Sequence, residues 1–174
     1  MSEKYVPTFT LNDGVEMPAV GLGTWQMQGD EVITAVRSAI DTGYRHIDTA
    51  AFYQNETDIG RAIHDAISAG DVTREELFIT SKVWNDQQSD HEVQAAFRAS
   101  LTNLGLDYLD CYMVHWPCPS TGRHVERFAA LSTLQGLGDV RSIAVANYNG
   151  DQLREVQEKT GIVPTINQVE LHPG

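Results

Sequence analysis

Five polar or ionisable residues stand near the carboxyl ends of short segments that are otherwise largely apolar. They are Asp48, Lys82, His115, Asn147 and Gln168. Lysine is almost never fully buried without a partner, so Lys82, which follows Leu-Phe-Ile-Thr-Ser, is expected to need one. If the segments are parallel strands of one barrel, their carboxyl ends meet at a single mouth, where such folds build active sites. The spacing therefore predicts a lined pocket.

Tyr53 adds acid–base chemistry to this set. Its phenol is a weak acid at neutral pH, and we expect a neighbouring ammonium, that of Lys82, to lower its pKa by favouring the phenolate. The carboxylate of Asp48 would hold that ammonium in place, and His115 could orient a carbonyl oxygen or share the proton. Such a set protonates an oxygen while a hydride arrives at the adjoining carbon.

Taken singly, these residues also have purely structural explanations. Asp48 could pair with Arg45 or cap the next segment, Lys82 could reach solvent, and a core position would suit His115. Metal binding by His46, Asp48 and His115 is a competing chemistry, but no HxH or HExxH spacing supports it, and a charged Lys82 would repel the ion. A Schiff-base role is disfavoured because Asp48 would keep Lys82 protonated and non-nucleophilic.

The elements that must position these residues alternate along the chain. A hairpin over 8–17, with Asp13-Gly14 in its turn, precedes strands that are each separated from the next by a helix. This alternation is typical of βαβ units and a parallel sheet. The predicted strands cover 19–25, 46–50, 77–83, 109–115, 140–147 and 165–171, and the predicted helices cover 30–41, 56–68, 90–104, 125–134 and 152–159.

Two α/β architectures fit this alternation, a doubly wound open sheet and a (β/α)8 barrel. A doubly wound dinucleotide fold should show GxGxxG after its first strand. Here Gly21-Leu22-Gly23 is followed by Thr24-Trp25-Gln26, so the third glycine is missing and the barrel is favoured.

Composition excludes several classes of protein. The 174 residues carry a net charge of −12 with no basic stripe, which disfavours nucleic acid and anionic membranes as partners. No apolar run is long enough to span a bilayer, and the first residues lack the apolar core of a secretory signal. The only cysteines, Cys111 and Cys118, form no CxxC pair. We therefore expect a single domain over 1–174 and a cytoplasmic location.

A series of short motifs runs in order along the chain. They are GLGTW at 21–25, YRHIDTA at 44–50, YQNE at 53–56 followed by Gly60, TSKVW at 80–84, LGLDYLD at 104–110, HWP at 115–117, VRSI at 140–143 and NQVELHP at 167–173. Together they resemble the aldo-keto reductase family, in particular its bacterial branch of 2,5-diketo-gluconate reductases. The resemblance implies a (β/α)8 TIM-type barrel with an N-terminal hairpin closing its bottom.

The same resemblance implies NADPH-dependent reduction of aldehydes and ketones, keto-sugars among them, with no metal. It makes Tyr53 the general acid, Lys82 and Asp48 the residues that tune it, and His115 the residue that orients the substrate carbonyl. The implied cofactor-binding residues are Gly23, Thr24, Asp48, Asn147 and Gln168, with both amides on the nicotinamide carboxamide. The implied substrate-binding residues are Trp25, Trp84, His115 and Trp116.

The chain departs from the family pattern in two ways. Ala146 stands where the family has a serine whose hydroxyl helps to bind the carboxamide, a hydrogen bond worth about 0.5–1.5 kcal/mol. Such barrels also have about 250 residues, so we expect a truncated barrel that stops after six strands, before those that complete the cofactor site. Unpaired edge strands then predict marginal stability and self-association. The alternative function is a catalytically silent packing or binding module.

Overall fold

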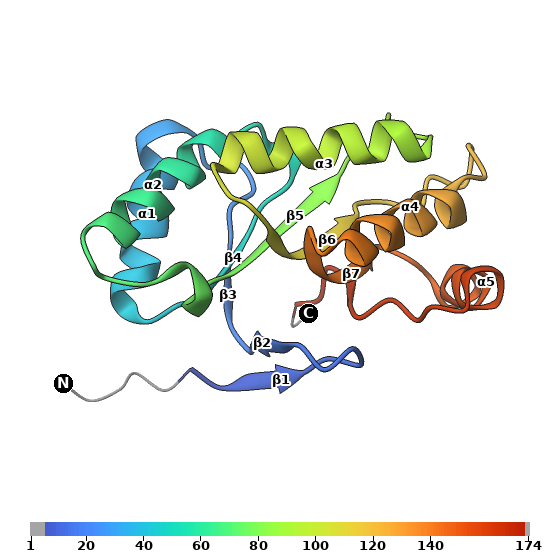
Figure 1. The fold of residues 1–174 in the computed structure, drawn as a ribbon, viewed down its shortest axis with the longest axis horizontal. Coiled ribbons are helices and arrows are strands. Elements are labelled where there is room, and N and C mark those ends of the chain that lie inside the picture. Colours follow the sequence, from blue (N-terminus) through green and yellow to red (C-terminus); the bar gives the residue numbers. More distant parts are fainter. Residues whose placement is uncertain (1–5, 173–174) are drawn as a thin grey trace.

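The computed structural model describes residues 6–172, which form a two-stranded hairpin followed by a six-stranded parallel sheet with helices (Figure 1). The hairpin pairs β1 (Thr8–Thr10) with β2 (Glu16–Pro18) in antiparallel register. The sheet runs in the order β3 (Gly21–Gly23), β4 (His46–Asp48), β5 (Phe78–Val83), β6 (Leu109–Val114), β7 (Val140–Ala146) and β8 (Asn167–Gln168).

Five helices connect the strands. They are α1 (Gly29–Thr42), α2 (Glu56–Ser68), α3 (Asp90–Leu104), α4 (His124–Leu137) and α5 (Gly150–Thr160). Two short 3-10 turns, η1 (Ala51–Tyr53) and η2 (Arg74–Glu76), flank α2. Within 6–172, no helix is both long enough and apolar enough to cross a membrane.

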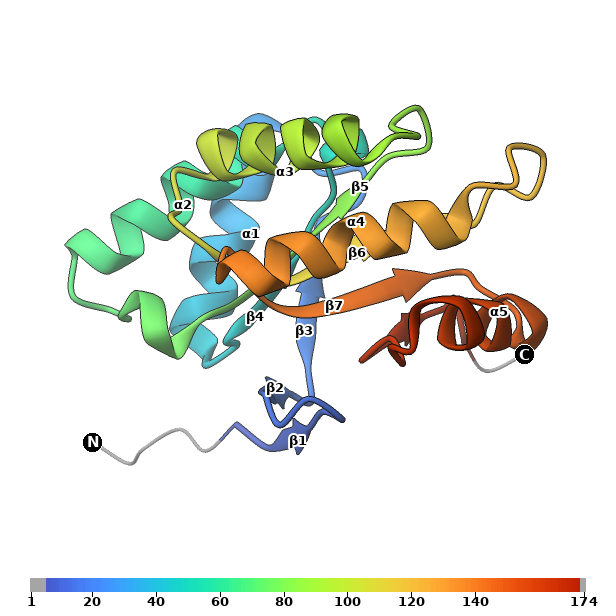
Figure 2. The same ribbon diagram turned by 45° about the vertical axis from the view of Figure 1, so that its right-hand side comes forward.

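Strand order confirms the barrel-type fold. Every strand of the sheet pairs with its sequence neighbour and all pairs are parallel. A doubly wound sheet reverses its strand order at a switch point, so that alternative is wrong. The observed sheet is a six-stranded arc of a (β/α)8 barrel, with helices α1 to α4 on its outer side (Figure 2).

The two faces of the strands have different partners, because side chains alternate along a strand. Ile47, Ile79 and Val145 belong to the apolar cluster that includes helix residues such as Val36 and Phe128. The other face of the sheet presents the more polar set, which includes His46, Asp48, Thr80 and Lys82, all buried. The inner face of the arc therefore carries the chemistry, and the outer face carries most of the core.

The hairpin closes the amino-terminal end of that inner face. Its residues Leu11, Val15 and Met17 pack on a second apolar cluster, which includes Phe78 and Met113. The Ser142 hydroxyl of β7 also donates a 2.7 Å hydrogen bond to Asp13 in the hairpin turn. This arrangement agrees with a hairpin that closes the bottom of the barrel.

Glycine allows helices α2 and α3 to approach closely. A Cβ added at Gly60, in α2, would lie 2.5 Å from the backbone oxygen of Leu104, the last residue of α3. That separation is too short for any side chain, so the packing of the two helices requires glycine at this position.

The sequence prediction is wrong at strand ends, most of all in the first and last strands of the sheet. The expected strand over 165–171 has strand geometry only at Asn167–Gln168, although Thr165 and Ile166 also form backbone hydrogen bonds with β7, and Val169 and Leu171 lie exposed beyond it. The expected strand over 19–25 narrows to Gly21–Gly23, the residues that pair in parallel register with β4. Strand ends depend on the pairing partner, which an apolar run does not reveal.

Candidate active site

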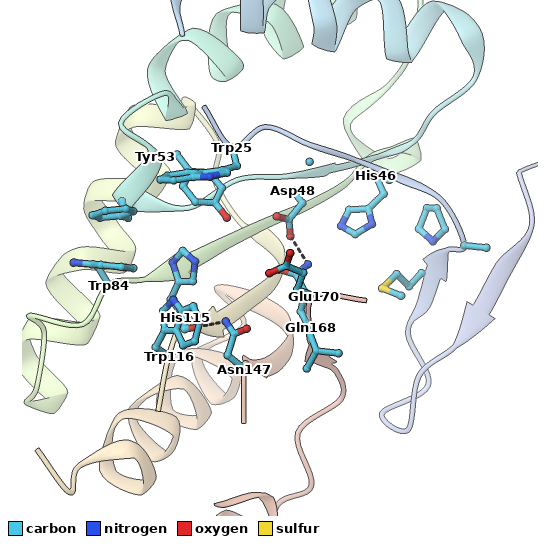
Figure 3. A pocket seen from close by; sticks show the side chains of 17 residues that line it. Trp25, His46, Asp48, Tyr53, Trp84, His115, Trp116, Asn147, Gln168 and Glu170 are labelled. Carbon is cyan, nitrogen blue, oxygen red and sulfur yellow. Dashed lines mark hydrogen bonds between the residues drawn. The ribbon is translucent and has the colours of Figure 1, made fainter. Parts of the chain in front are cut away.

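The carboxyl ends of the strands surround a cavity of about 940 Å³ (Figure 3). Asp48 ends β4, Lys82 is the penultimate residue of β5, His115 follows β6, Asn147 follows β7 and Gln168 ends β8. All but Lys82 line the cavity, together with Gly23, Trp25, Phe52, Tyr53, Trp84 and Trp116. The structure thus brings together nearly all of the residues that the sequence singled out.

Lys82 finds the partner that its burial requires. Its ammonium is fully buried and donates to the carboxylate of Asp48, and also to the backbone oxygen of Thr49 at 3.0 Å. The second carboxylate oxygen of Asp48 accepts a 3.0 Å hydrogen bond from the side-chain amide of Gln168. Strands β4, β5 and β8 are therefore joined by one buried polar network, which holds both charges in place.

The alternative pairing of Asp48 with Arg45 is wrong. The Arg45 guanidinium instead donates to the backbone oxygens of Ile40, at 3.1 Å, and Tyr44, at 2.8 Å. It thus satisfies one carbonyl in the last turn of α1 and one in the loop that follows, which leaves the Asp48 carboxylate to the cavity.

Tyr53 lies at the end of η1, immediately above this ion pair. The Lys82 nitrogen is 5.2 Å from the centre of its ring. Contrary to the sequence prediction, the pKa of Tyr53 is raised, to about 12, chiefly by burial and then by the negative charge of Asp48. Lys82 does not reverse this, because its charge is already paired with a carboxylate that also faces the phenol. Tyr53 therefore stays protonated at neutral pH.

His115 completes the group as a neutral imidazole. Its ring centre is 5.6 Å from that of Tyr53 and 5.0 Å from that of Trp84, both in edge-on contact. Burial first, and then the charge of Lys82, lower the pKa of His115 to about 4. Its buried Nδ1 has no hydrogen-bond partner among the described residues. A neutral imidazole can offer a hydrogen bond to a carbonyl oxygen without adding charge.

An aromatic wall bounds the mouth of the cavity. The Phe52 ring stacks on Trp84 at 3.7 Å between centres and on Trp25 at 5.6 Å, so three nearly parallel rings form one surface. Trp116 lies beside His115 and is 45% exposed (Figure 3). Phe52 was not among the predicted site residues, although its position directly before Tyr53 was the available signal.

Two amides and a glycine offer a surface for a flat polar ligand. Asn147 adopts φ of 64° and donates to the backbone oxygen of His115 at 3.1 Å. Gln168 lines the same side of the cavity, and Gly23 leaves open space where a Cβ would stand. Thr24 was also predicted here, but it is fully buried outside the cavity lining, and its hydroxyl donates to the backbone oxygen of Asp48 at 2.9 Å.

The candidate metal ligands serve other contacts. His46 is hydrogen-bonded to the Thr80 hydroxyl at 3.0 Å, and Asp48 is paired with Lys82. Across the part of the chain that the structure describes, no three His, Cys, Asp or Glu side chains are placed to hold a metal ion.

Comparison with known proteins places this geometry in a family. The model of the Aldo/keto reductase family matches residues 19–174. An aldo-keto reductase of Mycolicibacterium smegmatis is 48% identical over 96% of this chain and 59% of its own length. Methylglyoxal reductase DkgA of Escherichia coli is 47% identical over 94% of this chain and 57% of its own length.

A solved structure supports the same assignment. The crystal structure of a Bombyx mori aldo-keto reductase in complex with NADP has a TM-score of 0.88 and 41% sequence identity, over 95% of this chain and 58% of that one. The chain therefore spans somewhat less than three-fifths of the length of these proteins.

Proposed function

This chain belongs to the aldo/keto reductase family, and from that we propose that the protein reduces aldehydes or ketones to alcohols with NADPH as the hydride donor. Two relatives support the proposal: one carries the name methylglyoxal reductase, and the silkworm homologue binds NADP. Small reactive carbonyls are the substrates we propose, with keto-sugars within the same class.

One observation carries this proposal. A buried lysine–aspartate pair lies behind a protonated tyrosine, and a neutral histidine stands beside that tyrosine in the same cavity. Tyr53 presents a proton, Lys82 presents a positive charge, and His115 presents a hydrogen-bonding imidazole. This set suits an oxygen that gains negative charge and then a proton.

The roles of the residues follow from their charges. NADPH, when bound, supplies a hydride to the carbonyl carbon, which leaves the electron pair of the C=O bond on oxygen. His115 holds that oxygen, and Tyr53 transfers its phenolic proton to it, so that the product is a neutral alcohol. The phenolate left on Tyr53 is stabilised by the Lys82 ammonium until a solvent proton replaces the one lost. A pKa of about 12 does not prevent this transfer, because an alkoxide is more basic than a phenolate.

The cavity fits the nicotinamide end of the cofactor. A carboxamide needs one donor and one acceptor, and each amide of Asn147 and Gln168 has both. Gly23 leaves room beside them for a flat ring. We propose that Asp48, which already binds Gln168, keeps that amide in position, and that Thr24 supports Asp48 from behind. Ala146 offers no hydroxyl here, which weakens carboxamide binding.

The test compares NADPH oxidation at 340 nm for the parent chain and for Tyr53→Phe, with methylglyoxal as the substrate. Tyr44→Phe is the matched control, because Tyr44 is 37% exposed and lies outside the cavity lining. We expect Tyr53→Phe to lose about 10²–10⁴-fold in rate, as for loss of a general acid, and Tyr44→Phe to keep the parent rate. Equal rates for Tyr53→Phe and the parent would contradict the proposed role.

A second candidate is a packing or binding module without turnover, favoured by the edges of the sheet. Within residues 6–172, strands β3 and β8 each have a single partner, and Val20, Val169 and Leu171 are exposed nearby. Such edges promote pairing with another chain, so we propose self-association through them. Light scattering over a concentration series should show mass rising with concentration. A constant monomer mass, with a sharp unfolding transition and low binding of an apolar dye, would contradict self-association.

We propose the cytoplasm as the compartment. Both cysteines are free thiols, and Cys111 is fully buried in the core, where burial raises its pKa. A reducing compartment keeps such thiols in this state.

A further inference from the structure

Arg127 is the largest fully buried side chain among the described residues, and it lies in the first turn of α4. Its guanidinium donates to the backbone oxygen of Trp84 at 2.7 Å and to that of Trp116 at 3.0 Å. The buried Nε has no hydrogen-bond partner, and no carboxylate within the described residues forms an ion pair with it. The guanidinium thus donates its hydrogen bonds to two backbone carbonyl oxygens.

Such a placement needs an explanation beyond packing. A buried charge without an opposite charge is unfavourable, and an apolar side chain of similar size would fill the same space without that penalty. What the guanidinium provides is its rigid fork, which can bind two acceptors in fixed relative positions. The two acceptors here belong to loops that follow adjacent strands, β5 and β6.

Both loops form walls of the active-site cavity. Trp84 stacks on Phe52 and contacts the His115 ring edge-on, and Trp116 directly follows His115. The backbone oxygen of His115 is bound by Asn147 while the next one, that of Trp116, is bound by Arg127. Two consecutive carbonyls are therefore bound from different elements: the first by the loop that follows β7, and the second by α4.

We propose that Arg127 is a positioning residue, which sets the separation of the Trp84 and Trp116 walls and so the fit of the substrate carbonyl beside His115. This inference rests on the proposed function for its kinetic consequence only, because the separation of the walls is a property of the free protein. Val83 and His115, which precede the two tryptophans, are joined by a 3.2 Å backbone hydrogen bond, so loss of the fork leaves the loops connected there but removes the group that binds the Trp84 and Trp116 carbonyls together, and the tryptophans gain freedom.

The three tryptophans of the chain all line the cavity, so fluorescence excited at wavelengths that tryptophan absorbs and tyrosine does not reports on this site alone. In a Trp25→Phe background only Trp84 and Trp116 emit. We expect Arg127→Met to increase acrylamide quenching of this emission, and Arg127→Lys, which keeps the charge without the fork, to give an intermediate increase. Arg98→Met on α3 is the matched control, because Arg98 is exposed, and it should leave quenching unchanged. Circular dichroism establishes that each variant is folded.

The kinetic readout separates positioning from a general loss of structure. With Trp25 restored, we expect Arg127→Met to raise KM for methylglyoxal about tenfold while kcat changes less, because misplaced walls impair orientation and leave Tyr53 and Lys82 in place. Parent-like quenching in a folded Arg127→Met protein would overturn the proposal. If Arg127→Met does not fold, parent-like quenching in Arg127→Lys would overturn it, and increased quenching would support it. A parent chain without turnover contradicts the proposed function alone, since quenching still tests Arg127.

Discussion

Replacement of Lys82 by methionine tests the electrostatic core of the proposed reaction. Methionine is close to lysine in length and can occupy the same buried space, so the main change is loss of the ammonium. That charge lies 5.2 Å from the centre of the Tyr53 ring, on which a phenolate forms as the proton leaves. The variant therefore removes the positive charge nearest to the developing negative one.

The expected magnitude follows from this separation. Two unit charges 5.2 Å apart interact by about 3 kcal/mol at an effective dielectric constant of about 20. Because each 1.36 kcal/mol changes a rate about tenfold, Lys82→Met should lower kcat about 100- to 200-fold. The Asp48 carboxylate, left unpaired, opposes the phenolate further, and Asp48→Asn in the Lys82→Met background should restore part of the rate.

The assay is NADPH oxidation with saturating aldehyde, measured for the parent, for Lys82→Met, for Asp48→Asn and for the double variant that combines the two. Lys159→Met is the control, because Lys159 is exposed on α5 and its ammonium pairs with Glu155 of the same helix. Removing one partner of a buried ion pair destabilises a protein by about 3–5 kcal/mol, so rates are compared at temperatures where urea unfolding shows each variant to be folded. A folded Lys82→Met protein that keeps more than about a third of the parent kcat would refute the electrostatic argument.

Three further predictions concern packing, titration and cofactor binding. Gly60→Ala should lower the free energy of unfolding by about 1–3 kcal/mol, because its Cβ would meet the Leu104 backbone at 2.5 Å. Gly136→Ala, which has open space around it in α4, should raise the free energy of unfolding by up to about 1 kcal/mol. Urea titrations that rank the two variants the other way contradict the packing. His115 has its pKa lowered from 6.5 to about 4, so between these pH values the unfolded chain binds a proton that the folded protein does not. The free energy of unfolding therefore has its full value above pH 6.5 and falls as pH drops toward 4. His115→Gln should therefore flatten the fall of unfolding free energy across that window, and an unchanged slope contradicts a buried neutral imidazole. Gln168→Leu should weaken NADPH binding, measured by nicotinamide fluorescence, several-fold, and parent-like affinity would remove Gln168 from the cofactor site.

The sequence predicts helices better than strand ends, and the reason is physical. A helix is specified locally by its apolar stripe and its caps, so 56–68 and 90–104 were predicted with the observed bounds. Ser89 and Glu92 form the capping box that starts α3, and Gly105 ends it. A strand has no such local marker, because its extent is set by the neighbour with which it pairs. The expected strand over 165–171 therefore kept only two residues.

Site positions were predictable from topology, whereas electrostatics were not. A parallel barrel gathers strand ends at one mouth, which is enough to bring Asp48 and His115 together from distant parts of the chain. The direction of the Tyr53 pKa depends on how burial and two opposite charges add up in space, and the sequence contains only the charges. Arg127 gave no signal, because a single arginine within the apolar helical pattern of 125–134 predicts an exposed side chain.

The raised pKa of Tyr53 is consistent with a general acid once the neutral pair behind it is considered. An isolated ammonium beside the phenol would lower its pKa by about two units, which is the interaction of about 3 kcal/mol worked out above, and the phenol would still be protonated at neutral pH. Because Asp48 balances Lys82, burial dominates and keeps the proton on Tyr53. The Lys82 ammonium interacts more strongly with the phenolate that forms as the proton leaves than with the neutral phenol, and Asp48 offsets part of that gain. In the proposed reaction, Asp48 holds the Lys82 ammonium beside Tyr53, and that ammonium stabilises the phenolate more than the phenol, which is the differential stabilisation that catalysis requires.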